Sequence, residues 1–171
     1  DEVPGKHWRH LPEAVVRPQS AQEVSRIVRL ANREHIPVTP RGAGSGLSGG
    51  AVPMLGGIVV ATDRMNRILE LDEANMMIMV EPGVIANEIN EYIKPHGLFY
   101  AGYPMSMETC FIGGNVAENA GGGKAVKYGV TSRYVLGAEV VMPTGEIIEL
   151  GGKLLKDVTG YNILPLLIGS E

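Results

Sequence analysis

Two glycine-rich segments hold the residue types that are best suited to chemistry in this sequence. They run from Pro40 to Gly50 (PRGAGSGLSGG) and from Ile112 to Gly123 (IGGNVAENAGGG). Glycine loses more backbone freedom on folding than other residues, so such clusters indicate left-handed backbone or close approach to a ligand. Successive backbone N–H groups in such turns form concave nests that bind anions without a basic side chain. We therefore expect a phosphate-containing ligand, and two segments could hold an extended dinucleotide from opposite sides.

The elements around the first segment are expected to form a strand–helix–strand unit. We expect a strand over 14–16 and a helix that begins with a capping box between Ser20 and Glu23. Apolar residues then recur at helical spacing over 24–31, and a second strand over 36–39 leads directly into the glycines. Anion sites favour the carboxyl end of such a strand.

The rest of the sequence predicts an α+β fold. We expect strands over 57–61 and 76–80, followed by a helix over 85–93 that Pro95 ends. The second glycine segment is expected to form one or two helical turns, and residues 138–150 to form a hairpin. The predicted architecture is a small strand–helix–strand unit followed by a larger mixed sheet with helices.

Other nucleotide motifs fit the first segment less well. Residues 44–49 match GxGxxG, but a Rossmann site needs the third glycine inside a helix, and Gly50, Pro53 and Gly56 follow at once. Glu70, at the distance of a ribose-binding acid, lies in a charged segment. A Walker loop is excluded because no Gly-Lys-Ser/Thr occurs.

The composition restricts the classes of function. With 171 residues, 44% of them hydrophobic and 20% charged, the sequence is typical of a globular protein. A net charge of −4 with scattered lysines and arginines argues against a nucleic-acid partner. No apolar run is long enough to span a bilayer. The single cysteine, Cys110, excludes a disulfide or a thiolate metal cluster within this sequence, so we expect no metal and a reducing compartment, the cytoplasm or its membrane periphery.

Five motifs, in order, resemble the FAD-binding domain of the vanillyl-alcohol oxidase and p-cresol methylhydroxylase type of flavoenzyme. Within this family the sequence is most similar to the branch that contains the flavin subunit of glycolate oxidase and FAD-linked D-lactate dehydrogenases. The motifs that carry the resemblance lie at 40–51, 112–122, 127–129, 135–141 and 160–171. An ordered set of this kind is far more specific than a single glycine pattern.

The resemblance implies that FAD lies extended between two α/β subdomains. The first, over 1–62, would hold the pyrophosphate loop, and the second, over 63–171, is expected to be truncated before a substrate domain. The cofactor-binding residues implied in the first are Arg41, Gly42, Ala43, Gly44, Ser45, Gly46 and Leu47. Those implied in the second are Pro104, Met105, Ser106, Cys110, Gly113, Gly114, Asn119, Gly121, Gly122, Tyr128, Gly129, Val140 and Val141.

Three positions depart from the family's pattern. Tyr103 and Met105 flank Pro104 where the family usually has an acidic residue and a serine, and Phe111 stands where a hydroxyl residue is common. Relatives that attach flavin covalently have a histidine near the place of Ser45. Because serine cannot form that bond, we expect FAD to be bound non-covalently.

The resemblance implies an FAD-dependent dehydrogenase or oxidase that acts on a small 2-hydroxy acid such as glycolate or D-lactate. The α-hydrogen would pass to the flavin as a hydride while a base takes the hydroxyl proton. No catalytic residue is assigned, because the resemblance places the substrate-binding residues in a following domain, so this sequence alone is expected to be inactive. A partner subunit, a quinone or oxygen would accept the electrons. A non-catalytic FAD-binding module and an FAD- and NADPH-dependent reductase of the same fold are the alternatives.

Several single residues allow two interpretations. Asn115 and Asn119 either contact the ligand or cap the glycine-rich backbone, and Arg41 either pairs with phosphate or braces its own loop. Cys110 is more simply a buried structural residue than a reactive thiol. His7 and His10 have a metal-like spacing, but two ligands without a third rarely make a site.

Overall fold

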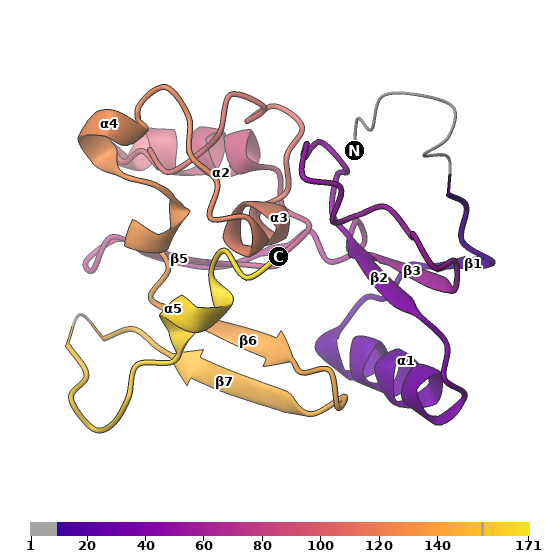
Figure 1. Cartoon of the computed structure of the whole chain (residues 1–171). Helices are drawn as coiled ribbons and strands as arrows, with labels where there is room; N and C mark the ends of the chain where they lie inside the picture. Colours follow the sequence, from indigo (N-terminus) through magenta and orange to yellow (C-terminus); the bar gives the residue numbers. More distant parts are fainter. Residues whose placement is uncertain (1–9, 155) are drawn as a thin grey trace.

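Figure 1 shows the fold as a computed structural model, in which residues 10–154 and 156–171 are described. Within these ranges the strands form three separate sheets of three, two and two strands, with helices between and over them. This mixture of helices and sheets confirms the expected α+β class. One detail differs: in place of a single larger sheet, the described residues after position 63 form two separate antiparallel pairs of strands.

The strand–helix–strand unit at the start is confirmed. Strands β1 (Ala14–Val16) and β2 (Val38–Arg41) both pair in parallel with β3 (Ile58–Ala61), which lies between them. The middle strand forms the core of this sheet, because Val59 and Val60 are buried on it. Since β2 ends at Arg41, the first glycine segment leaves the carboxyl edge of a parallel sheet.

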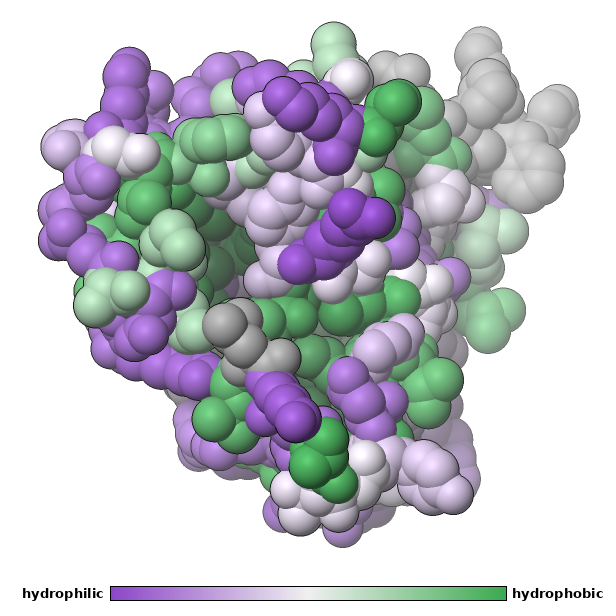
Figure 2. Space-filling model, turned by 90° about the vertical axis from the view of Figure 1, so that its left-hand side faces the viewer, coloured by the Kyte–Doolittle hydropathy of each residue, from purple (hydrophilic) through white to green (hydrophobic). Residues whose placement is uncertain are grey.

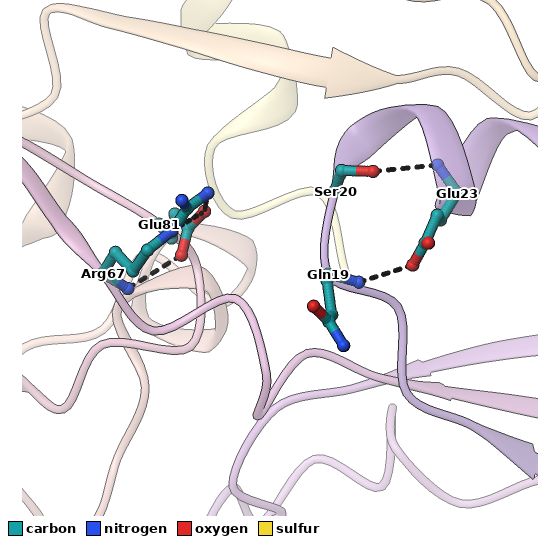
Figure 3. A network of polar contacts seen from close by, with 5 residues as sticks. All are labelled: Gln19, Ser20, Glu23, Arg67 and Glu81. Carbon is teal, nitrogen blue, oxygen red and sulfur yellow. Dashed lines mark hydrogen bonds and ion pairs between the residues drawn. The ribbon is translucent and has the colours of Figure 1, made fainter.

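Helix α1 (Ala21–Arg33) begins at the expected N-cap, but the capping box is displaced by one residue. The Ser20 hydroxyl accepts a hydrogen bond from the Glu23 N–H at 3.3 Å, as expected. The Glu23 carboxylate accepts from the N–H of Gln19 at 2.8 Å and not from that of Ser20 (Figure 3). Two amide groups at the helix start are satisfied in either arrangement.

The second sheet and its helix enclose a hydrophobic core. Strands β4 (Ile68–Asp72) and β5 (Met77–Val80) form an antiparallel hairpin, and helix α2 (Ala86–Ile93) packs Ile89 and Ile93 against it. Strand β4 was not expected, because its residues lie in a charged stretch that reads as a loop. The chain continues past Ile93 as a short 3-10 helix, η2 (Lys94–His96), so Pro95 lies inside a helical turn.

The remaining elements are short and surround the second glycine segment. They are α3 (Ile112–Ala117), α4 (Ala125–Tyr128), the 3-10 helix η3 (Thr131–Arg133), the expected hairpin of β6 (Gly137–Val141) and β7 (Ile147–Gly151), and α5 (Leu164–Leu167). Figure 1 places α3 near the middle of the molecule, between the first sheet and α4. Within the described ranges, no helix has the length and apolar character needed to cross a membrane.

The hairpin of β6 and β7 packs against α1, far away in the sequence. The buried Ser25 hydroxyl donates to the Gly145 carbonyl at 2.5 Å, and the Asn32 amide donates to the Pro143 carbonyl at 2.6 Å. These two contacts join the first unit of the fold to the third sheet.

Candidate functional site

The structure places the two glycine segments against each other. A Cβ built on Gly42 would lie 3.7 Å from the Phe111 Cβ atom and 3.9 Å from the amide nitrogen of Gly114. Further along, the Ser48 hydroxyl lies 2.9 Å from a carboxylate oxygen of Glu118, just after α3. The first segment therefore contacts both the beginning and the end of α3.

The backbone of the first segment presents several amide groups that the described part of the fold does not use. Gly44 and Gly49 have positive φ angles of 69° and 90°, which give the loop its left-handed turns. Among the described residues, the N–H groups of Ala43, Ser45, Gly46 and Leu47 donate to no carbonyl or side chain. Adjacent amides of this kind are the donors that an anionic group requires.

Arg41 lies at the start of this loop and folds back over it. A Cβ atom on Gly44 would overlap the Arg41 guanidinium, so the charged group rests on the loop's own backbone. Of the two interpretations of Arg41, this geometry favours bracing of the loop. The guanidinium nevertheless keeps a positive charge within the first segment.

The two glycines that open α3 have different surroundings. The Gly113 N–H donates to the Pro82 carbonyl at 2.8 Å, and a Cβ on Gly113 would lie 2.7 Å from the Pro82 Cβ. Among the described residues, a Cβ on Gly114 would meet no heavy atom within 4 Å apart from its chain neighbours and its own helix. Gly113 is therefore required by packing, whereas Gly114 borders open space beside the first segment.

Asn115, in α3, and Asn119, just after it, also differ in their hydrogen bonding. Asn119 has a positive φ of 49°, and its side-chain oxygen accepts a hydrogen bond from the Ser132 N–H at 2.9 Å, so it caps η3. Asn115 is only 3% exposed, and its side-chain nitrogen has no hydrogen-bond partner among the described residues. Of the two, Asn115 is the one whose unpaired side-chain donor is buried.

The other residues of the implied flavin site form a second group around the turn at 104–110. Gly122 packs against this turn, because its Cβ would lie 2.6 Å from the Tyr103 carbonyl and 3.1 Å from Pro104. The Ser106 carbonyl accepts from the Cys110 N–H at 2.9 Å, and the Cys110 thiol is buried as expected. Met105 is largely exposed.

Four residues of the implied set lie further out. Tyr128 and Gly129 end α4, where the Tyr128 ring packs edge-on against Phe99 at a centroid distance of 5.7 Å. Val140 and Val141 lie in β6, which packs mainly against β7 and α1. The structure thus brings together the first segment with Gly113 and Gly114, and Gly122 with Pro104, while β6 is held in a separate sheet.

One ion pair near the site was missed at the level of sequence. The Glu81 carboxylate accepts hydrogen bonds from Arg67 (Figure 3), and this pair holds the pKa of Glu81 below its usual value. Nothing local in the sequence pointed to a partner of Glu81 that lies 14 residues earlier. As for metals, the described residues contain no group of three or more His, Cys, Asp or Glu side chains that lie close enough together to hold a metal ion, and His7 lies outside them.

Comparison with sequence families gives one match over most of the chain. The model of the FAD binding domain family matches residues 12–151. The glycolate oxidase subunit GlcD of Bacillus subtilis is 46% identical over 164 residues, which is 96% of this chain and 35% of that protein. A D-lactate dehydrogenase of Anaerostipes hadrus is 45% identical over 160 residues, 94% of this chain and 34% of that protein. The chain therefore spans about a third of the length of these relatives.

Solved structures show the same fold. An alkyldihydroxyacetonephosphate synthase superposes with a TM-score of 0.76 at 27% identity, over 91% of this chain and 30% of that one. The 6-hydroxy-D-nicotine oxidase of Arthrobacter nicotinovorans superposes with a TM-score of 0.72 at 31% identity, over 84% of this chain and 31% of that one.

Proposed function

This chain belongs to the FAD binding domain family, and from that premise we propose that it holds FAD extended between its two glycine segments. The observation that carries the proposal is their approach: the Cβ position of Gly42 lies 3.9 Å from the amide nitrogen of Gly114, and Gly114 borders open space. The unused amides of the first segment supply donors for a diphosphate. The residues present therefore fit the cofactor.

We propose the following residues as the contacts. They are 41–47 on one side of the cofactor and 104–106, 110, 113–114, 119, 121–122, 128–129 and 140–141 on the other. We also retain the division into subdomains at 1–62 and 63–171, which the end of the first sheet at Ala61 supports.

The part of this chain in the chemistry is to bind and orient. Main-chain N–H groups offset the diphosphate charge without a cluster of cations, and the absence of a side chain at Gly114 allows close approach. The turn at 104–110, closed by the Ser106–Cys110 hydrogen bond, forms a wall of the site. When bound, FAD supplies the acceptor of a hydride.

We infer that the whole protein is an FAD-linked oxidoreductase of a small 2-hydroxy acid, of the glycolate or D-lactate type. The names of the relatives support this reaction class. No group in the described part of the chain is assigned as the base, and we infer that the substrate-binding residues belong to a further domain. We accordingly expect these 171 residues to show no turnover of glycolate or D-lactate.

Electrons must also leave the cofactor. We propose that a partner subunit, a quinone or oxygen accepts them. The single cysteine supports a reducing location such as the cytoplasm.

The first experiment is a titration of the purified chain with FAD, followed by the quenching of flavin fluorescence and by absorbance. Saturable binding is the expected result. Replacing Gly114 by valine places a branched side chain in the space beside the first segment, so we expect FAD affinity to fall at least tenfold. Unchanged affinity in the Gly114→Val variant would place the cofactor elsewhere.

Gly97→Asn is the matched control. Gly97 also borders open space, at the end of η2, and its φ of 72° is one that asparagine tolerates. We expect wild-type FAD affinity in this variant.

The non-covalent attachment has its own test. Because Ser45 stands where covalent relatives have histidine, acid precipitation should leave the yellow colour in the supernatant. Colour retained on the polypeptide would contradict this.

A further inference from the structure

Glu81 is the one charged side chain that is buried in the described part of the chain, with 8% of its surface exposed. Within the described ranges, Arg67 supplies all the hydrogen bonds to the Glu81 carboxylate (Figure 3). The backbone N–H of Arg67 donates to Oε2 at 2.8 Å, and Nε and Nη2 donate to Oε1 at 3.1 and 2.6 Å. A guanidinium that binds one carboxylate through two nitrogens fixes direction as well as distance.

The ion pair holds a turn in place against residues 62–67. Glu81 begins the turn, and two residues later the Gly83 N–H donates to the Met65 carbonyl at 2.7 Å. A Cβ on Gly83 would overlap the Thr62 carbonyl and lie 2.8 Å from the Met65 carbonyl oxygen. The two backbone stretches are therefore in direct contact, with no side chain between them.

These two stretches reach both glycine segments. The Thr62 N–H donates to the carbonyl of Arg41, where the first segment begins, at 3.0 Å. On the other side, the Pro82 carbonyl accepts from the Gly113 N–H at 2.8 Å, within the second segment. A continuous set of backbone contacts thus runs from Arg41 to Gly113 through the turn that the ion pair holds.

We propose that the Arg67–Glu81 pair is a positioning device that sets the spacing between the two glycine segments and thereby the affinity for FAD. The proposal rests on the proposed function, because it takes the cofactor to lie between those segments. Neither side chain touches FAD in this scheme. Both act through the contact of Pro82 with Gly113.

The test uses Arg67→Met and Glu81→Gln. The first removes the two guanidinium donors, and the second removes the charge while keeping the shape. Coupling through a packed network of this kind typically corresponds to a few-fold to about thirtyfold in binding, and we expect each variant to weaken FAD binding about tenfold. Arg67→Lys, which keeps the charge, should recover part of the loss.

Glu70→Gln is the matched control. Glu70 is in β4, close to Arg67 in the chain, and pairs with Lys153 at 2.5 Å, but the contacts that join the glycine segments do not pass through it. We expect its FAD affinity to stay within twofold of wild type. The titrations are made at a temperature where circular dichroism shows each variant to be folded, and Arg67→Lys replaces Arg67→Met if the latter does not fold.

A second measurement does not depend on the cofactor. Amide hydrogen exchange of the FAD-free chain should be faster over 110–114 in Arg67→Met and Glu81→Gln, and unchanged in Glu70→Gln. A purely structural ion pair would lower the melting temperature but leave both the FAD dissociation constant and this exchange at wild-type values, which would overturn the proposal.

The two proposals fail in different ways. A wild-type chain that binds no FAD refutes the proposed function, and hydrogen exchange then decides alone whether the pair sets the spacing. Weakened binding in Gly114→Val together with normal binding and exchange in Arg67→Met refutes the positioning role only.

Discussion

Neighbouring glycines in this fold serve different physical purposes. Gly113 has no side chain because Pro82 occupies the space, whereas Gly114 has none although the space beside it is open. Sequence alone treats the two as one motif. The distinction appears only when the turn that follows β5 is seen to pack on the first residues of α3, a contact between positions about 30 residues apart.

Alanine substitutions should separate these two purposes. Gly113→Ala forces a methyl group against Pro82, and overpacking of this kind costs about 1–3 kcal/mol of unfolding free energy. Gly114→Ala adds a methyl group in open space within a helix, where alanine is favoured over glycine by about 0.5–1 kcal/mol. The midpoint of urea unfolding of the cofactor-free chain should therefore fall for Gly113→Ala and rise for Gly114→Ala. Equal shifts of the two midpoints would contradict the different roles given to these glycines.

The charge of Glu81 predicts a dependence of stability on pH. Arg67 lowers the pKa of Glu81 in the folded state, so its stabilisation is complete above the unfolded pKa, about 4.3, and is lost as the pH falls through the lower folded value. Glu81→Gln should lower the free energy of unfolding by about 2 kcal/mol at pH 7, a typical value for hydrogen bonds to a charged group. Thermal unfolding is measured from pH 7 to pH 3 for the wild-type chain and for Glu81→Gln. The difference between their melting temperatures should become smaller below pH 4. A difference in melting temperature that stays the same at every pH would show that the charge of Glu81 does not contribute to stability.

At the scale of elements, local signals predicted most of the fold. The capping residues of α1 and the residues of the expected hairpin over 138–150 belong to short stretches of sequence, and both elements formed where expected. Strand β4 was not predicted because it lies in a charged stretch of sequence, and its pairing with β5 contains a register shift. Helices α4 and α5 have four residues each, too few for a periodic pattern.

The cap of α1 gives a prediction at this scale. Ser20→Ala removes the side-chain acceptor of the Glu23 N–H and leaves it only the Ser20 carbonyl, and loss of an N-cap costs about 1 kcal/mol. Denaturant unfolding should show a lower midpoint with an unchanged slope. Gln22→Ala, an exposed position in the same turn, is the control and should be neutral or slightly stabilising.

At the scale of the whole molecule, a substantial apolar surface remains uncovered. The face that is turned toward the viewer in Figure 2 shows hydrophobic residues among hydrophilic ones. Among its described residues, the segment after β7 alone exposes five large side chains, Leu154, Val158, Tyr161, Ile163 and Leu166. Exposed apolar patches on an isolated chain mark surfaces that another surface covers.

This surface predicts that the isolated chain self-associates. Sedimentation velocity at rising protein concentration should show a growing fraction of species larger than 18.3 kDa. Val158→Ser with Leu166→Ser should reduce that fraction without lowering the melting temperature, because both side chains are exposed. A strictly monomeric wild-type chain at all concentrations would contradict this prediction.

The packing of α1 on the β6–β7 hairpin has a consequence for the order of synthesis. Ser25 and Gly145 are 120 residues apart, so the face of α1 that carries Ser25 has no partner while the ribosome makes the intervening chain. At roughly 5–20 residues per second, this interval lasts about 6–24 s. The parallel sheet can form within that time from residues 14–61 alone, whereas the face of its helix stays open to chaperones until the hairpin emerges.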